Sequence, residues 1–258
     1  MTTAATRRGA TTPILWLETV DSTNAEARRR AEAGEEGPLW IAARRQTEGR
    51  GRRGRAWSTT PGDLAATLLT STAYGPAEAA GVSFVAALAV ADLADTYAPA
   101  PLVALKWPND VLLAGNKLSG ILVESGPRPD GLWLAVGVGV NLASAPTGVE
   151  RPAAALGDHL RADRAAPPSP HEALDVLAGA FDCWAALWER GRLPLILDAW
   201  AGRCPGIPGP CTARLPDRTL EGTAEGLDSA GRLRLRLADG SLRLISAGDV
   251  FFPGAREG

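Results

Sequence analysis

The pattern of apolar residues changes once along this chain of 258 residues, at the stretch 204–211, "CPGIPGPC". Before that stretch, strand-like runs alternate with helical segments, a combination typical of an α+β domain. After it come only short alternating runs, and the pair Asp239-Gly240 marks a hairpin. The sequence therefore predicts two domains, one over residues 1–203 and a small β-barrel over residues 204–258.

Start and stop signals place the helices of the first domain. Thr23 and Glu26 form a capping box ahead of a helix that Gly34 ends, and Ser169 and Glu172 form another ahead of a helix that runs to residue 190. The apolar segment 78–97 is interrupted by a charge at position 92 and indicates a buried helix. A shorter helix is expected at 194–203. The predicted strands are 13–20, 38–46, 63–71, 131–142 and two around a Gly115-Asn116 turn.

Charge and cysteine content exclude several classes of protein. The net charge is −2 and the isoelectric point about 5.8, so any basic site must be local. Cys183, Cys204 and Cys211 are an odd, sparse set that indicates a reducing compartment, and no leader or membrane-spanning run is recognisable. The cysteines lack zinc-ribbon spacing, and His159 and His171 form no ligand pair. We therefore expect a cytoplasmic protein without metal ligands of its own.

A loop rich in glycine and arginine is the first candidate site. Residues 48–57, "EGRGRRGRAW", contain G-x-G-x-x-G from Gly49 to Gly54. A dinucleotide fingerprint needs a helix to start there, but "RAWSTTPGD" follows, and no P-loop pattern is present. Exposed N–H groups and four arginines suit carboxylates or phosphates. A solvated basic turn is the alternative.

Three further motifs carry polar groups suited to a ligand. "DSTN" at 21–24 leaves hydroxyls at a helix start, although a plain helix cap explains it as well. "KWPND" and "NKLSG" hold Lys106 and Lys117, the two lysines among 27 basic residues; their clustering suggests sites where a guanidinium cannot replace an ammonium. "GVGVNL" at 137–142 allows close backbone approach, although a buried strand is the simpler explanation.

In this order and spacing, "DSTN", "GRGRRGRAW", "KWPND", "NKLSG" and "GVGVNL" resemble the motifs of biotin protein ligases. The resemblance implies an α+β fold: a mixed β-sheet catalytic domain flanked by helices, class II synthetase-like, followed by a small SH3-like β-barrel. Fewer than twenty residues precede the first predicted strand. We therefore expect the monofunctional class, without the DNA-binding domain of the repressor-type members.

The resemblance implies a reaction in which ATP and Mg²⁺ activate biotin as biotinyl-5′-AMP, which a lysine of a biotin carboxyl carrier domain of acyl-CoA carboxylases then attacks. No DNA or membrane partner is implied. Lys106 and Arg52 would be catalytic. Biotin would contact Ser22, Thr23, Asn24, Gln46, Gly49, Arg50, Gly51 and Lys106. The nucleotide would contact Arg52, Arg53, Trp57, Lys117 and Asn141.

The sequence is also compatible with three other functions. A lipoate or octanoate ligase would share the catalytic fold, but its motifs are not matched here. A non-enzymatic nucleic-acid module could use the arginine loop and the barrel, and its binding would fall steeply with ionic strength. An adaptor built on the barrel has no specific sequence feature in its favour.

Overall fold

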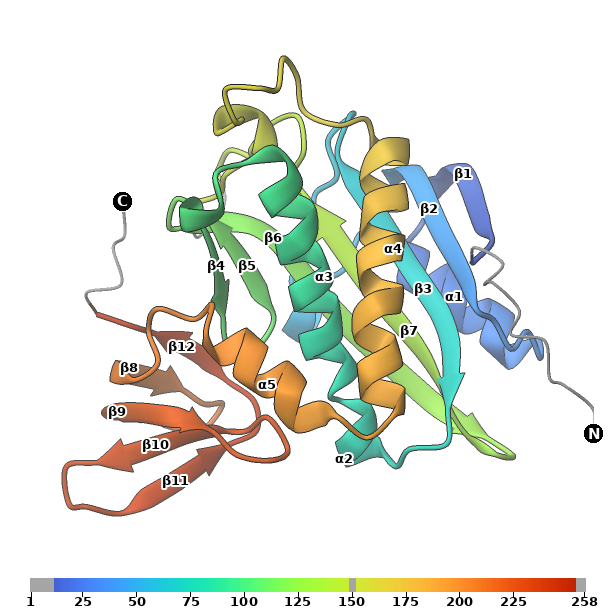
Figure 1. Cartoon of the computed structure of the whole chain (residues 1–258). Helices are drawn as coiled ribbons and strands as arrows, with labels where there is room; N and C mark the ends of the chain where they lie inside the picture. The colour runs from blue at the N-terminus through green and yellow to red at the C-terminus, as the bar shows by residue number, and fades with distance from the viewer. Residues whose placement is uncertain (1–11, 149–151, 254–258) are drawn as a thin grey trace, which may run out of the picture.

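The structure, a computed structural model, describes residues 12–148 and 152–253. Its strands form a seven-stranded sheet and a five-stranded sheet. Figure 1 shows the smaller sheet, formed by the C-terminal part of the chain, beside one end of the larger one. The change of pattern along the sequence thus corresponds to two sheets, while the domain boundary at 203/204 stays a prediction.

The larger sheet is mixed and has the strand order β1-β2-β3-β7-β6-β5-β4. β1 and β2 are parallel, and the other neighbouring pairs are antiparallel. β7 lies in the middle of the sheet and is buried along most of its length, which its apolar and glycine-rich sequence permits. The strands are β1 (Ile14–Val20), β2 (Leu39–Gln46), β3 (Leu64–Thr72), β4 (Val103–Lys106), β5 (Asp110–Leu113), β6 (Asn116–Arg128) and β7 (Gly131–Val140).

Helices cover both faces of this sheet (Figure 1). α1 (Thr23–Glu32) packs against β2, β3 and β7, and α3 (Val82–Tyr97) lies beside α4 (Pro170–Glu189) on the opposite face. α5 (Leu193–Ala201) packs against α3 and α4, and the short α2 (Pro76–Ala79) precedes α3. The remaining helical turns are η1 (Arg52–Gly54), η2 (Ala100–Leu102) and η3 (Leu156–Asp158).

The predicted buried helix is the segment formed by α2 and α3. Residues Pro76–Tyr97 are long and apolar enough to cross a membrane by composition alone, but 72% of the apolar window is buried inside the fold. Phe84 on α3 packs edge-on against Trp200 of α5. The segment is therefore the central core helix.

The smaller sheet is antiparallel, in the order β11-β10-β9-β8-β12. Its hairpin between β10 and β11 contains Asp239 and Gly240, as predicted. It is joined to the larger domain through Trp107, whose buried indole donates to the Gly231 carbonyl at 3.0 Å. The strands are β8 (Gly209–Arg214), β9 (Thr219–Leu227), β10 (Leu233–Leu237), β11 (Leu242–Ile245) and β12 (Asp249–Phe251).

One of the two predicted capping boxes is confirmed. Ser169 and Glu172 cap α4 reciprocally, as expected. The box at Thr23 and Glu26 is wrong, because Ser22 is the N-cap residue and α1 has no side-chain cap hydrogen bond. The Thr23 hydroxyl contacts Gln46 and Thr67 instead, so this helix start turns its polar groups toward the interior.

The tight turn between β5 and β6 lies one residue earlier than predicted, on Ala114 and Gly115. Both residues have positive φ, at 50° and 82°, which is the conformation of a type I′ hairpin turn. Alanine is strained there, because its Cβ crowds the following carbonyl.

Replacing Ala114 with asparagine is therefore expected to raise the free energy of unfolding by about 1 kcal/mol. The midpoint of urea unfolding measures this. Ala114→Val, whose branched side chain tolerates positive φ worse than alanine, should lower the same midpoint. A higher midpoint in both variants would contradict the assigned turn.

Candidate active site

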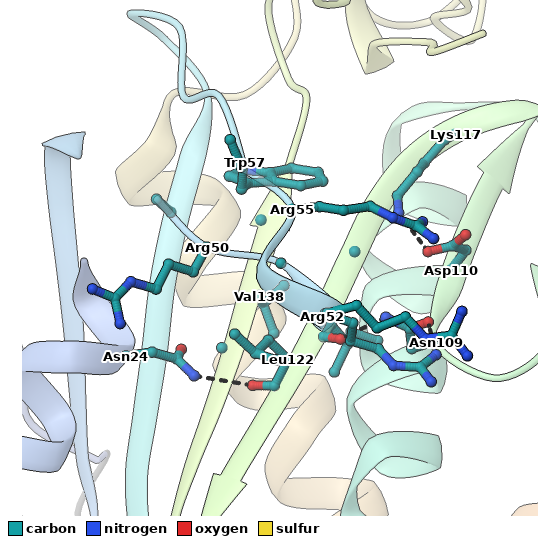
Figure 2. A pocket seen from close by; sticks show the side chains of 18 of the residues that line it. Asn24, Arg50, Arg52, Arg55, Trp57, Asn109, Asp110, Lys117, Leu122 and Val138 are labelled. Carbon is teal, nitrogen blue, oxygen red and sulfur yellow. Dashed lines mark hydrogen bonds and ion pairs between the residues drawn. The ribbon is translucent and has the colours of Figure 1, made fainter. Parts of the chain in front are cut away.

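A cavity opens on the α1 side of the large sheet, beneath the Gly/Arg loop 48–57 (Figure 2). Its floor is formed by β6 and β7, and its rim by the start of α1, the loop, and the turn between β4 and β5. Ten of the thirteen residues predicted from the motifs line it. They are Ser22, Thr23, Asn24, Gln46, Arg50, Gly51, Arg52, Arg53, Trp57 and Lys117.

The polar end of the cavity is built from the turn before α1. The Arg29 guanidinium donates two hydrogen bonds of 2.7 Å to the Asp21 carboxylate. These bonds hold the pKa of Asp21 well below its usual range. The same carboxylate accepts from the Ser22 N–H. Thr23 N–H donates to Gln46 Oε1 at 2.9 Å. The turn is thereby fixed to both its own helix and β2.

Two glycines of β7 make room for site side chains. A Cβ on Gly137 would lie 2.0 Å from the Asn24 amide oxygen, and one on Gly139 would lie 2.3 Å from the Trp57 indole. Both positions therefore require glycine for steric reasons. The "GVGVNL" motif thus provides a floor on which Asn24 and Trp57 rest.

The Gly/Arg loop is held by its own backbone. Gly51 N–H donates to the Arg55 carbonyl, and Trp57 N–H donates to the Gly49 carbonyl. Between them lies η1, in which Arg53 has a φ of 58°, an uncommon left-handed conformation for a residue with a side chain. This fold directs several guanidinium groups over the cavity, as Figure 2 shows for Arg50, Arg52 and Arg55.

Arg52 is the arginine most deeply engaged with the cavity. Its guanidinium donates to Asn109 Oδ1 at 2.8 Å, and Asn109 in turn donates to the Ile121 carbonyl of β6. Burial lowers the pKa of Arg52, and the positive Arg53 beside it lowers that pKa further. Arginine nevertheless stays charged at neutral pH. The cavity therefore contains a partly buried cation suited to an anionic ligand.

Another cation, Lys117, lies on the same side of the cavity, since its partner Asp110 directly follows Asn109. Lys117 Nζ is 2.6 Å from the Asp110 carboxylate and 5.8 Å from the centroid of the Trp57 ring (Figure 2). Trp57 and Lys117 together present an aromatic face and an ammonium, a pair suited to a base and a phosphate.

Three predicted residues do not line the cavity. Gly49 supports the loop through its carbonyl. Asn141 is buried and donates to the carbonyls of Ala154 and Lys117, so its amide ties the end of β7 to the chain before η3. Lys106 ends β4, and its Nζ lies over the Phe251 ring, 5.4 Å from the centroid. An ammonium at this place is next to the cavity, because Trp107 and Pro108 line it.

Strand β12 of the smaller sheet is the part of the site that the motifs did not predict. Asp249 and Val250 line the cavity, and Asp249 Oδ2 pairs with Arg53 at 3.1 Å and with Arg55 at 2.5 Å. The missed residues Asn109 and Asp110 belong to "KWPND" and could have been found there. Asp249 follows no local pattern, and only the packing of the two sheets brings it to the loop.

Removing the Asp249 carboxylate is expected to loosen the loop. In Asp249→Ala, the rate of tryptic cleavage after Arg53 and Arg55 should rise about threefold to tenfold, because two partly exposed ion pairs are lost. Mass spectrometry of early digests measures the rate. Asp217→Ala, which removes an exposed aspartate paired with its neighbour Arg218, is the matched control. Equal cleavage in both variants would show that Asp249 does not restrain the loop.

Within the described residues, no group of three or more histidine, cysteine, aspartate or glutamate side chains could hold a metal ion. The three cysteines are free thiols, and burial raises the pKa of Cys204 and Cys211 to about 11. The cavity is lined by hydroxyls, amides, cations and the carboxylates of Asp110 and Asp249, and its cations suit an anionic ligand.

Comparisons with known proteins agree with this chemistry. The model of the Biotin/lipoate A/B protein ligase family matches residues 16–141, and that of the Biotin protein ligase C terminal domain matches residues 210–252. A biotin–[acetyl-CoA-carboxylase] ligase of Paracoccus denitrificans is 43% identical over 92% of this chain and 100% of its own length. A ligase of the same name from Mycobacterium tuberculosis is 33% identical, over 89% of this chain and 85% of its own. The biotin protein ligase of Aquifex aeolicus, solved with biotin and ATP, has the same fold, with a TM-score of 0.74 at 23% identity over 93% of this chain and 97% of that one.

Proposed function

Because this chain belongs to the biotin protein ligase family, we propose that its cavity activates biotin with ATP and passes the biotinyl group to a lysine of a carrier protein. The protein is an ATP-dependent biotin ligase. The observation that supports this assignment to the cavity is that all five motifs contribute lining residues to one hollow. We place the acceptor lysine in a biotin carboxyl carrier domain, the partner that the relatives' name implies.

Biotin occupies the polar end of the cavity in this proposal. Ser22, Thr23 and Gln46 hydrogen-bond the ureido ring, since their hydroxyl and amide groups line that end. Asn24 supports them from behind. Arg50 and Gly51 lie along the tail and its carboxylate, under the loop. The vitamin thus points its carboxylate toward Arg52.

The first step joins two anions, so its barrier depends on charge. The biotin carboxylate oxygen attacks the α-phosphorus of ATP, the new O–P bond replaces the bond to pyrophosphate, and pyrophosphate leaves. Two unit charges about 4 Å apart repel by roughly 4 kcal/mol at an effective dielectric constant of 20. Arg52 and Lys106 offset this repulsion and stabilise charge as it moves in the transition state. They are the residues that we assign to catalysis.

The nucleotide lies at the other end, where Trp57 stacks on adenine and Lys117 contacts a phosphate. Arg53 adds charge near the phosphates, and Asn141 would need to leave its two carbonyl partners to reach adenine. The described residues form no carboxylate cage for Mg²⁺. Mg²⁺ would therefore enter on the phosphates of ATP, where it neutralises charge.

The second step consumes the intermediate. The carrier lysine, as a free amine, attacks the carbonyl carbon of biotinyl-5′-AMP; an amide bond forms, AMP leaves with the bonding electrons, and the amine loses its proton. The mixed anhydride is sensitive to water, so a loop closed over it protects it as well as orienting it. We place this activity in the cytoplasm, where free cysteines persist.

Calorimetry followed by turnover tests this function. We expect biotin to bind, ATP·Mg²⁺ to bind more tightly afterwards, pyrophosphate to appear, and a carrier domain to gain one biotinyl group. With lipoate or octanoate in place of biotin, no pyrophosphate should appear. Its release with either compound would instead indicate a lipoate or octanoate ligase, which shares this catalytic fold. Binding of nucleic acid that falls steeply with salt, without turnover, would instead favour a nucleic-acid module.

A further inference from the structure

Behind the polar end of the cavity, a continuous series of polar side chains crosses the domain from β2 to β6. It consists of Gln46 on β2, Thr23 and Asn24 on α1, Thr67 on β3, and Glu124 on β6. Thr67 is fully buried, and Thr23 and Asn24 are 4% exposed. Neither Thr67 nor Glu124 lines the cavity, so any role in ligand binding acts through the others.

The orientation of the Asn24 amide is fixed by two groups that only accept. Its Nδ2 lies 3.2 Å from the Leu122 carbonyl, as the dashed line in Figure 2 shows, and 2.7 Å from Glu124 Oε2. Only the NH₂ end of an amide can donate to a carbonyl and a carboxylate. The Asn24 oxygen therefore faces Thr67 Oγ1, at 2.8 Å.

This orientation determines where the hydroxyl protons go. The Asn24 oxygen can only accept, so the single hydroxyl proton of Thr67 is donated to it. Thr67 Oγ1 also lies 2.8 Å from Thr23 Oγ1, and the proton of that contact must then come from Thr23. The proton of Thr23 thus points into the interior. Its 3.2 Å contact with Gln46 Oε1 is left without a proton between the two oxygens.

We infer that Thr67 and Glu124 are positioning residues that make this end of the cavity accept hydrogen bonds rather than donate them. Two acceptor oxygens, Thr23 Oγ1 and Gln46 Oε1, lie 3.2 Å apart at the cavity wall. They favour a ligand that points an N–H group at this pair of oxygens. The ureido ring of biotin carries N–H groups, so the inference rests on the proposed function and assigns the recognition of one ring N–H.

The test compares two ligands in several variants. The ligands are biotin and a cyclic carbamate analogue in which a ring oxygen replaces one ureido N–H. In Thr67→Val the Thr23 hydroxyl is free to donate to Gln46, so the ureido N–H of the ligand contributes less to binding. The ratio of the two dissociation constants, carbamate over biotin, should fall at least about fivefold. Thr67→Ser keeps the hydroxyl and should restore the wild-type ratio.

Three further variants serve as a second test of the hydroxyl, a test of Glu124 and a control. Thr67→Ala also lacks the hydroxyl and should shift the ratio in the same direction if Thr67→Val folds poorly, and so should Glu124→Leu. Thr96→Val removes a hydroxyl that donates within α3, far from the cavity, and should leave the ratio unchanged. Equal weakening of both ligands in Thr67→Val would overturn the inference. A wild-type protein that binds neither ligand would instead overturn the proposed function.

Discussion

In Lys106→Ala, pyrophosphate release is expected to fall by about 10²–10³-fold, while the dissociation constant of biotin changes less than about threefold. The reason is that the ammonium offsets repulsion between two anions, which exists only when both reactants are present. Lys106 ends β4 beside the cavity wall and rests over Phe251 of β12 without ligand. Lys106 has to turn toward the reactants, and until then its ammonium is held over the aromatic ring by a cation–π contact.

Two variants control for this result. Arg214 also lies over the Phe251 ring, 4.6 Å from its centroid, so Arg214→Ala removes a cation from the same ring without touching the cavity. Its pyrophosphate release should stay within about twofold of wild type. Lys106→Arg keeps the charge but not the compact shape, and it should remain at least tenfold slower. Loss of biotin binding in Lys106→Ala equal to the loss of turnover would contradict the assigned role.

Local patterns were enough to predict most elements and most of the cavity. Strand-like runs predicted β1, β2 and β3, and the reciprocal Ser169 and Glu172 pair predicted the start of α4. The glycines of "GVGVNL" predicted that another group lies close to the backbone of this strand. The sequence did not predict which groups these are. Ten of the residues assigned from the resemblance to biotin protein ligases line the same cavity.

Contacts between distant parts of the chain could not be predicted in this way. Asp249 meets Arg53 across 196 residues, and Asn24 meets Glu124 across 100. Thr23 shows the limit most clearly, because its residue type suits a helix cap and a cap was predicted. The structure gives its hydroxyl to Thr67 instead, since the buried partner is available only after β3 has packed against α1.

Arg52 of the Gly/Arg loop lies where two hollows meet, together with Pro108, Asn109, Ile121 and Leu122. It lines the main cavity and also an adjoining one formed by α2, the start of α3, β6 and Ser246, which directly follows β11. Its hydrogen bond to Asn109 holds it there. A bound adenylate would thus be retained both by the charge of Arg52 and by its bulk.

In Arg52→Gly, biotinyl-5′-AMP is expected to escape about 100-fold faster, since a charge-assisted contact and a barrier are lost together. Rapid gel filtration after mixing with ATP and labelled biotin measures retention, and labelling of serum albumin detects free adenylate. Arg53→Gly is the matched loop control: Arg53 is more exposed, is neutralised by Asp249 and already has a φ that suits glycine. It should release adenylate no more than about fivefold faster. Because Asn109→Ala leaves the guanidinium charged but unanchored, it should fall between the two. Retention in Arg52→Gly as long as in wild type would mean that the intermediate is held by the floor of the cavity rather than by the loop.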